Sequence, residues 1–187
     1  MISSREFASS LYGLWLLLKL DRTGFTCFER TVGGFWRSYV AAVVVAPFNF
    51  LHAGLSYEPA EGGLGFGPYM IVEFLSYVLS WTAYPLAMIY ISRLLAREAR
   101  LLDYLVPYNW FQLAVAALVF PVMLLFDAGI LSPEGMAFLQ LLSLGIFVSY
   151  AAFLARVALD VVLSTAFALV LFDFMINLLV SQVIARI

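Results

Sequence analysis

Five segments of this chain are each long and apolar enough to cross a lipid bilayer as a helix. Such a helix needs about 20 mostly apolar residues, and the segments that meet this need lie near 33–54, 68–92, 108–127, 135–155 and 160–183. Of the 187 residues, 64% are apolar and only 12% are charged, which leaves too little polar surface for a water-soluble domain. The sequence therefore predicts an all-α fold: one membrane domain, a polytopic bundle of five transmembrane helices whose partner is the lipid bilayer.

The boundary between the last two predicted spans carries few turn signals. From Met136 to Ile184 there is no proline, and the only glycine is Gly145. One continuous helix over this length would be about 70 Å long, more than twice the thickness of the hydrocarbon core. Arg156 and Asp160 are the only charges available to meet water, so we expect a tight helical hairpin there.

Residues 3–20 are predicted to form an amphipathic helix that lies on the membrane surface. Ser3 or Ser4 can cap it, and Arg5 and Lys19 can reach lipid headgroups. The apolar side chains that recur at helical spacing are Phe7, Leu11, Leu14, Trp15 and Leu18. We expect no cleaved signal peptide, because no small-residue cleavage site follows the apolar run.

The distribution of charge predicts the orientation in the membrane. One set of connections holds nine of the ten basic residues: Arg5, Lys19, Arg22, Arg30, Arg37, Arg93, Arg97, Arg100 and Arg156. The opposite loops hold acidic residues instead: Glu58, Glu61, Asp127 and Glu134. The positive-inside rule then places the N-terminus in the cytoplasm and the C-terminus in the periplasm of a bacterial inner membrane, with Arg186 as the exception.

Two stretches resemble the YIP-domain family of five-span membrane proteins. They are LDRTGFTCFERTVGGFWRSYVAAVVVAP at 20–47 and LVPYNWFQLAVAALVFP at 105–121. The resemblance implies a cytoplasmic N-terminus, five compact helices and a bacterial relative of proteins that interact with Rab GTPases in eukaryotes. It does not imply Rab binding, because the family's eukaryotic Asp-Leu-Tyr-Gly-Pro signature has no counterpart here.

Catalytic and cofactor-binding signatures are missing from the sequence. It has no G-x-S-x-G, H-E-x-x-H or phosphate-binding G-x-x-x-x-G-K-[ST] pattern. A single cysteine, Cys27, and a single histidine, His52, argue against a transition-metal site. The net charge of −2 and scattered basic residues argue against nucleic acid as a partner. We therefore expect a protein that is not an enzyme and that holds neither a cofactor nor a metal.

A polar stripe runs along the fifth predicted span. Its members differ by multiples of four and so share one helix face: Thr165, Asp173, Asn177 and Ser181. A charged side chain at mid-span costs about 2.5–3.5 kcal/mol, so we expect this stripe to face the interior of the bundle. A matching face on the fourth span is predicted from Gln140, Ser143 and Tyr150.

Asp173 admits two main interpretations. No cationic side chain is within reach, so we expect its carboxyl group to carry a proton and to donate to a facing Gln, Ser or Tyr. In the first interpretation this hydrogen bond only joins helices. In the second, Asp173 binds and releases a proton, or binds a substrate, during transport. A contact with a partner protein is a third.

The other polar candidates lie nearer the ends of the spans. Glu73 enters the second span from outside and Arg37 enters the first from the cytoplasm, so we expect no pairing between them. The turn LLAREARLLDYLVPYN is predicted to carry a basic cytoplasmic face that could hold anionic lipid headgroups or an acidic partner. Its members, spaced by four and three, are Arg93, Arg97 and Arg100.

Aromatic side chains gather at the predicted span ends, as in the aromatic belts of membrane proteins. Tyr104, Tyr108 and Trp110 are among them. Trp81 and Tyr84 lie deeper in the second span. We expect them to pack in the core; the alternative is that they line a groove for a lipid or a quinone-like ring.

Two functions are consistent with these features. The first is a scaffold or accessory subunit that works through other membrane subunits or self-association. The second is a small proton-linked transporter or channel that uses Asp173, which predicts a water-accessible cavity between spans two, four and five. An intramembrane enzyme that acts on a lipid is a third class, but the sequence offers no set of nucleophile, base and metal ligands for it.

Overall fold

The fold is known from a computed structural model, which describes residues 2–58 and 63–184. Throughout these residues the regular structure is helical, without a strand, and five of the helical segments are long and apolar enough to span a membrane. The prediction of an all-α transmembrane bundle is therefore confirmed. Glu61 and Arg186, which entered the orientation argument, lie outside the described residues.

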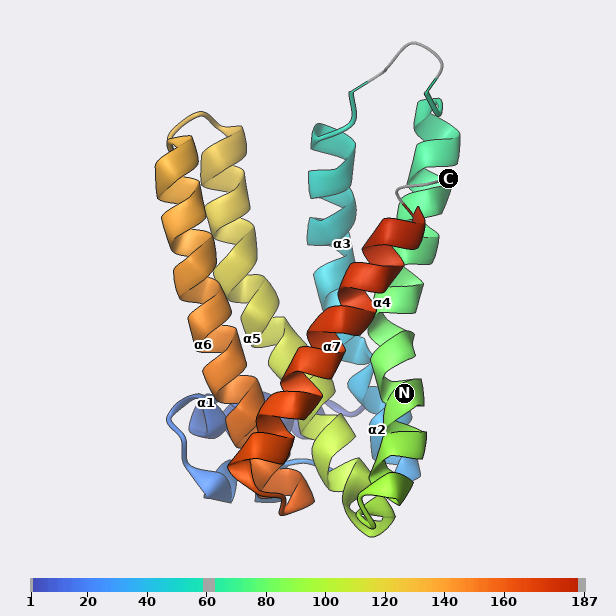
Figure 1. Cartoon of the computed structure of the whole chain (residues 1–187), viewed down its shortest axis with the longest axis vertical. Coiled ribbons are helices and arrows are strands. Elements are labelled where there is room, and N and C mark those ends of the chain that lie inside the picture. The colour runs from blue at the N-terminus through green and yellow to red at the C-terminus, as the bar shows by residue number, and fades with distance from the viewer. Residues whose placement is uncertain (1, 59–62, 185–187) are drawn as a thin grey trace.

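The helices are numbered along the chain (Figure 1), with two short 3₁₀ helices marked η. The elements are α1 (Ser4–Leu18), η1 (Arg22–Cys27), α2 (Val32–Ser38), α3 (Val40–Leu55), α4 (Phe66–Leu94), η2 (Glu98–Arg100), α5 (Leu101–Asp127), α6 (Pro133–Leu159) and α7 (Leu163–Ile184). The first span consists of α2 and α3, which are separated by a break at Tyr39.

The third span begins earlier than predicted. α5 starts at Leu101 rather than near residue 108, so the expected polar turn up to Asn109 is wrong beyond Arg100. The charges that indicated a loop belong to the first turn of the helix, where Asp103 lies close to unpaired backbone N–H groups. Asp103 also pairs with Arg30 at 3.2 Å.

The hairpin between α6 and α7 lies where it was predicted. Asp160 ends α6 with a left-handed backbone conformation, at a φ of 53°. The N–H of Val161 then donates to the carbonyl of Arg156 at 3.3 Å, the bond that closes many helix ends. Because aspartate tolerates this conformation better than most residues, the chain reverses here without glycine or proline.

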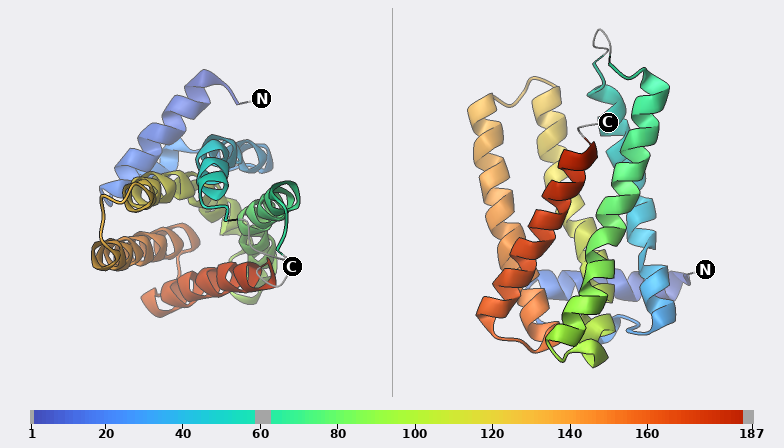
Figure 2. Two further views of the ribbon diagram at one scale, coloured as in Figure 1. Left: turned by 90° about the horizontal axis from the view of Figure 1, so that it is seen from above. Right: turned by 45° about the vertical axis from the view of Figure 1, so that its right-hand side comes forward.

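α1 lies across the spans rather than along them (Figure 2). Ser3 caps it by accepting from the N–H of Glu6 at 3.1 Å. Its inner face differs in part from the predicted apolar face: Leu14 and Leu17 are buried, whereas Trp15 is 48% exposed. The helix is therefore docked on the protein as well as placed to meet lipid.

Three contacts fasten α1 to the bundle. Glu6 accepts from Arg37 at 2.8 Å, the ring of Phe7 meets that of Trp110 at 5.4 Å, and the hydroxyl of Tyr150 donates to the carbonyl of Leu18 at 2.5 Å. These contacts join α1 to α2, α5 and α6. Arg37 also pairs with Glu29 at 3.2 Å. The acidic partners of Arg37 are therefore Glu6 and Glu29 and not Glu73.

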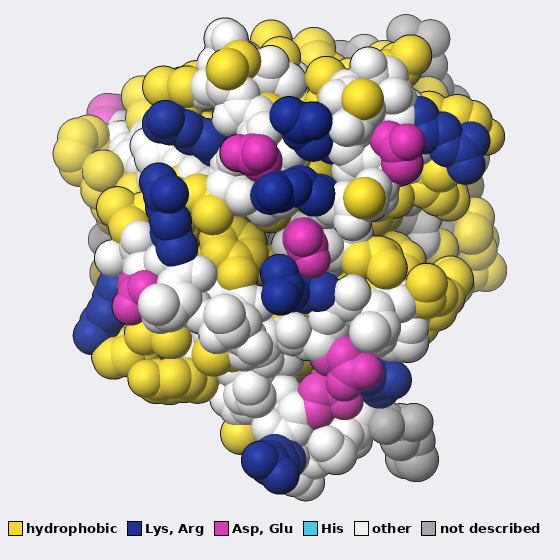
Figure 3. Space-filling view, turned by 90° about the horizontal axis from the view of Figure 1, so that it is seen from below, with side chains coloured by type: hydrophobic (Ala, Val, Ile, Leu, Met, Phe, Trp, Pro, Cys, Tyr) yellow, Lys and Arg dark blue, Asp and Glu magenta, His cyan; other side chains and the backbone are white. Residues whose placement is uncertain are grey.

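The two ends of the bundle differ. We call the end that carries the α4–α5 and α6–α7 connections the basic end; Figure 3 shows its Lys and Arg side chains interspersed with Asp and Glu. Most of the buried residues lie towards this end, including Met88, Trp110, Ala155 and Leu159. Towards the opposite end, α5 and α6 lean away from α4 and α7 (Figure 1).

Candidate functional site

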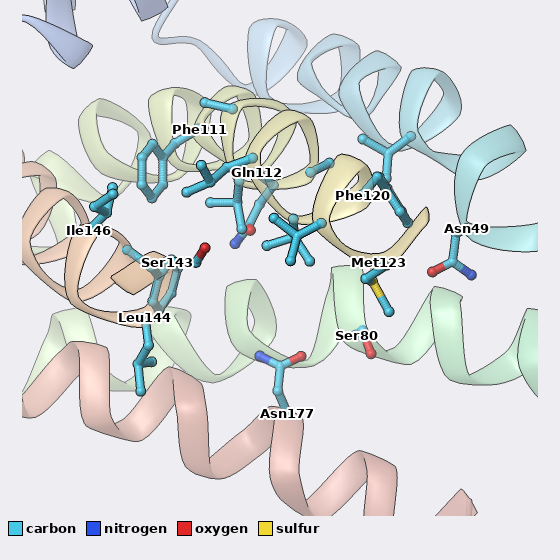
Figure 4. A pocket seen from close by; sticks show the side chains of 18 of the residues that line it. Asn49, Ser80, Phe111, Gln112, Phe120, Met123, Ser143, Leu144, Ile146 and Asn177 are labelled. Atoms are coloured by element: carbon cyan, nitrogen blue, oxygen red, sulfur yellow. The ribbon is translucent and has the colours of Figure 1, made fainter. Parts of the chain in front are cut away.

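A cavity of about 810 Å³ lies among helices α3 to α7. Polar side chains point into it from five helices (Figure 4): Asn49, Ser80, Gln112, Ser143 and Asn177. The rest of its wall is mainly apolar. This combination of volume, apolar wall and a few converging polar groups is typical of small-molecule sites.

Asp173 lies at the deep side of the cavity and is only 3% exposed. The hydroxyl of Tyr108 donates to its Oδ2 at 2.8 Å, and Nδ2 of Asn177 donates to its Oδ1 at 3.0 Å. The same amide nitrogen of Asn177 also donates to the backbone carbonyl of Asp173 at 3.0 Å. These bonds hold the carboxyl group in one orientation, with one edge towards the cavity.

The partner of Asp173 differs from the prediction. The fourth span was expected to supply it, but it is Tyr108 from α5. The reason is the tilt of α7, which packs against α6 near their shared turn and also against α4, where Phe172 meets Tyr84 at 6.4 Å. Gln140 and Tyr150 line the same cavity without bonding to Asp173.

A cluster of three tyrosines, Tyr84, Tyr104 and Tyr108, closes the cavity on the side of the basic end. The hydroxyls of Tyr84 and Tyr104 are 2.8 Å apart, and the rings of Tyr84 and Tyr108 are 5.0 Å apart. Each of the three is at most 4% exposed. Since α5 starts at Leu101, Tyr104 and Tyr108 lie one turn apart inside the bundle.

For these residues the aromatic-belt prediction is wrong. Tyr104 and Trp110 are each 1% exposed, and Tyr108 is 4% exposed. Belt residues sit at the membrane–water boundary with one end in water, which these three side chains cannot do. The signal in the sequence was the spacing of four between Tyr104 and Tyr108, which places both hydroxyls on one helix face. Of the two deeper aromatics, Tyr84 is core and Trp81 lines the cavity.

Glu73 lines the shallow part of the cavity. It lies eleven positions before Tyr84 on α4, which corresponds to about 16 Å along the helix axis. Since Tyr84 marks the depth of Asp173, the two carboxyl groups lie at different levels. Among the described residues, Glu73 makes neither a hydrogen bond nor an ion pair.

The three predicted basic-face arginines do not share a helix. Arg93 lies in the last turn of α4, and Arg100 belongs to η2. Arg97 lies between them, after Ala96 reverses the chain with a φ of 51°. Nε of Arg97 donates to the carbonyl of Asp160 at 3.3 Å, and Arg100 lies 3.7 Å from the Asp160 carboxylate. Two of the arginines therefore brace the α6–α7 turn.

The cavity is open at its side. Leu144 of α6 and Phe174 of α7 both line it, yet they are 42% and 46% exposed. Figure 1 shows that α6 and α7 diverge towards the opposite end of the bundle, and the exposure of these two lining residues indicates an opening between the helices. A molecule dissolved in the bilayer can therefore reach the cavity between α6 and α7.

Within residues 2–58 and 63–184, no group of three His, Cys, Asp or Glu side chains could hold a metal ion. His52 is paired with Asp127 at 3.3 Å, near the opposite end. Comparison with family models, curated proteins and solved structures gave no match.

Water access to the cavity can be tested on α4. With Cys27 replaced by alanine, we expect Ser80→Cys to react with a charged, water-soluble thiol reagent, because Ser80 lines the cavity. Ser92→Cys on the same helix should stay unmodified, because Ser92 is 0% exposed. Mass spectrometry after timed labelling in native membranes measures the modified fraction of each cysteine. Equal protection of both cysteines from the charged reagent would mean that the cavity is filled by lipid rather than water.

Proposed function

We propose that this integral membrane protein is a small proton-linked transporter for an amphipathic molecule. The observation that supports this function is the cavity itself: polar groups from five helices converge at membrane depth, beside a carboxyl group. A helical bundle that served only as a scaffold would gain nothing from an opening of this size, which removes packing contacts between its helices.

Asp173 is the proton-binding group in this proposal. Its carboxyl faces Tyr108 of α5, with Tyr84 of α4 and Tyr104 behind it, and none of these carries a positive charge. Among the described residues that line the cavity, none is Lys, Arg or His. No cationic neighbour competes with a proton for this carboxyl group.

The proposed orientation is based on charge. The basic end would face the cytoplasm of a bacterium, and the cavity would open to the outer half of the inner membrane. The tyrosine cluster would then form the closed gate on the cytoplasmic side. Transport would require the hydrogen bond between Tyr84 and Tyr104 to break while the outer ends of the helices approach each other.

The test is movement of solute and protons across liposomes that contain only this protein. A pH-sensitive dye inside the vesicles reports protons while amphipathic solutes of positive, negative and zero charge are added in turn. At least one solute is expected to change the internal pH faster than in protein-free vesicles. The proposal fails if every solute gives the same rate with and without protein.

A second candidate is a non-enzymatic accessory subunit or scaffold. The open side between α6 and α7 favours it, because a helix of another subunit, or of a second copy, could cover the same exposed residues, Leu144 and Phe174. The arginines of the basic end could contribute contacts to anionic lipid headgroups. Gentle extraction followed by native mass measurement would separate the two: stoichiometric partners favour the subunit, and their absence favours the transporter. The relationship to YIP-domain proteins stays a prediction.

A further inference from the structure

The ionisable side chains of opposite sign are not balanced in the cavity: among its described lining residues the acids have no basic counterpart. Two carboxyl groups line it, Glu73 at the shallow level and Asp173 at the deep level, and the described lining residues include no Lys, Arg or His. An anionic ligand would meet Glu73, and Asp173 whenever it is ionised, in a site that lipid shields from water, where repulsion between like charges is strong. A cation would find a carboxyl at each level.

The walls are suited to a cation that carries apolar surface. Aromatic rings line the cavity in pairs: Tyr77 and Trp81 lie 6.0 Å apart on α4, and Phe111 and Phe147 lie 6.1 Å apart across α5 and α6. The faces of such rings attract organic cations electrostatically. A small hydrated metal ion would instead need several oxygen ligands close together, and the two carboxyls lie at levels about 16 Å apart along α4.

The two acids differ in what they already bind. Both oxygens of Asp173 accept hydrogen bonds, from Tyr108 and Asn177. Glu73 has no such partner among the described residues and is half-buried; the polar Ser76 and Asn49 line the same cavity. A cation entering from the opposite end of the bundle would therefore meet Glu73 before Asp173, with the Glu73 charge unshared.

From these features we infer that the cavity binds a lipophilic organic cation, an amine or a quaternary onium ion, with Glu73 as its first anionic contact. The inference rests on the proposed transport function only for its biological meaning, because binding can be measured without transport. The cavity volume of about 810 Å³ falls within the roughly 300–1,000 Å³ of small-molecule sites.

A pair of probes isolates the charge. Tetraphenylphosphonium and tetraphenylborate have nearly the same size and shape and opposite charges. Equilibrium dialysis of the purified full chain in detergent, corrected with protein-free micelles, gives the affinity for each. We expect the phosphonium to bind at least about tenfold more tightly than the borate. Equal affinities, or tighter binding of the borate, would overturn the inference.

Variants then locate the contact. Glu73→Gln is expected to weaken phosphonium binding about tenfold, whereas Glu98→Gln removes the same charge from an exposed position at the basic end and should leave it unchanged. Unchanged affinity in Glu73→Gln would refute the assignment of Glu73. Phosphonium binding without any flux would retain this inference and reject transport; flux of a neutral or anionic solute without phosphonium binding would do the reverse.

Discussion

Asp173→Asn is expected to keep the fold and to abolish proton-dependent solute movement, whereas Asp173→Leu is expected to destabilise the bundle itself. The reason is the pair of hydrogen bonds at the carboxyl group. An asparagine side chain can hold both, because the hydroxyl of Tyr108 can accept from its amide as well as donate. Leucine has a similar size but leaves the Tyr108 hydroxyl without its partner, and Asn177 keeps only its bond to the backbone carbonyl of residue 173.

The expected loss in Asp173→Leu is about 1–3 kcal/mol, the cost of leaving a buried polar group unpaired. It exceeds the roughly 0.6 kcal/mol average of interhelical hydrogen bonds in membranes, because the Tyr108 hydroxyl is nearly inaccessible to water. Thermal unfolding in detergent measures it, and liposome flux measures the activity of Asp173→Asn. Glu98→Gln, which removes a carboxylate from an exposed position without an ion pair among the described residues, is the control.

Together, Asp173→Asn and Asp173→Leu also distinguish a role of Asp173 in hydrogen bonding from a role in proton binding. Full flux in Asp173→Asn would mean that hydrogen bonding is its whole role and that no proton is carried there. A normal melting temperature in Asp173→Leu would contradict the assigned contacts with Tyr108 and Asn177.

Gly34→Ala is expected to destabilise the protein by about 1–3 kcal/mol, the usual cost of overpacking. A Cβ at Gly34 would collide with the backbone carbonyl oxygen of Glu29 and lie 2.8 Å from its carbonyl carbon. The backbone at Gly34 is held in place, because Thr31 caps α2 by accepting from the N–H of Gly34 at 3.0 Å. Relieving the collision would disturb this cap.

Gly33→Ala is the control from the same helix. Its Cβ would meet the end of the Arg37 side chain at 3.0 Å, and a flexible guanidinium can shift. Both substitutions raise helix propensity by about 1 kcal/mol, so a difference between them reports what each Cβ contacts rather than propensity. Thermal stability should fall in Gly34→Ala and hold or rise in Gly33→Ala. Equal melting temperatures would contradict the close approach of α2 to Glu29.

Features of the fold that depend on local rules could be predicted from the sequence. The spans are long apolar runs, and the α6–α7 turn had to fall near Asp160 because the bilayer limits the length of a helix. The cap of α1 at Ser3 is one of the two that were expected, Ser3 or Ser4. The expectation that the polar stripe of α7 faces the interior came from the absence of hydrogen-bond partners in lipid. Asp173 is buried and Thr165 and Asn177 are half-buried, but the expectation is wrong for Ser181, which is exposed near the end of the helix.

The sequence could not predict which helix faces that stripe. Spacing along one helix fixes a face but not the neighbour it meets, because tilt depends on the packing of all the helices together. α7 leans towards α4, so Tyr108 rather than Gln140 or Tyr150 reaches Asp173. The charged first turn of α5 and the proline at position 107 hid the helical start that brings Tyr104 and Tyr108 into the bundle.

The lateral opening between α6 and α7 makes binding here a matter of exchange. The acyl chains of surrounding lipids can enter by the same route as any solute, and in a bilayer they greatly outnumber it. Apparent affinity then depends on what is displaced as well as on what binds. Short-chain detergent and long-chain lipid should therefore give different dissociation constants for one probe, and a change in the cell's acyl chains would alter activity with no change in the protein.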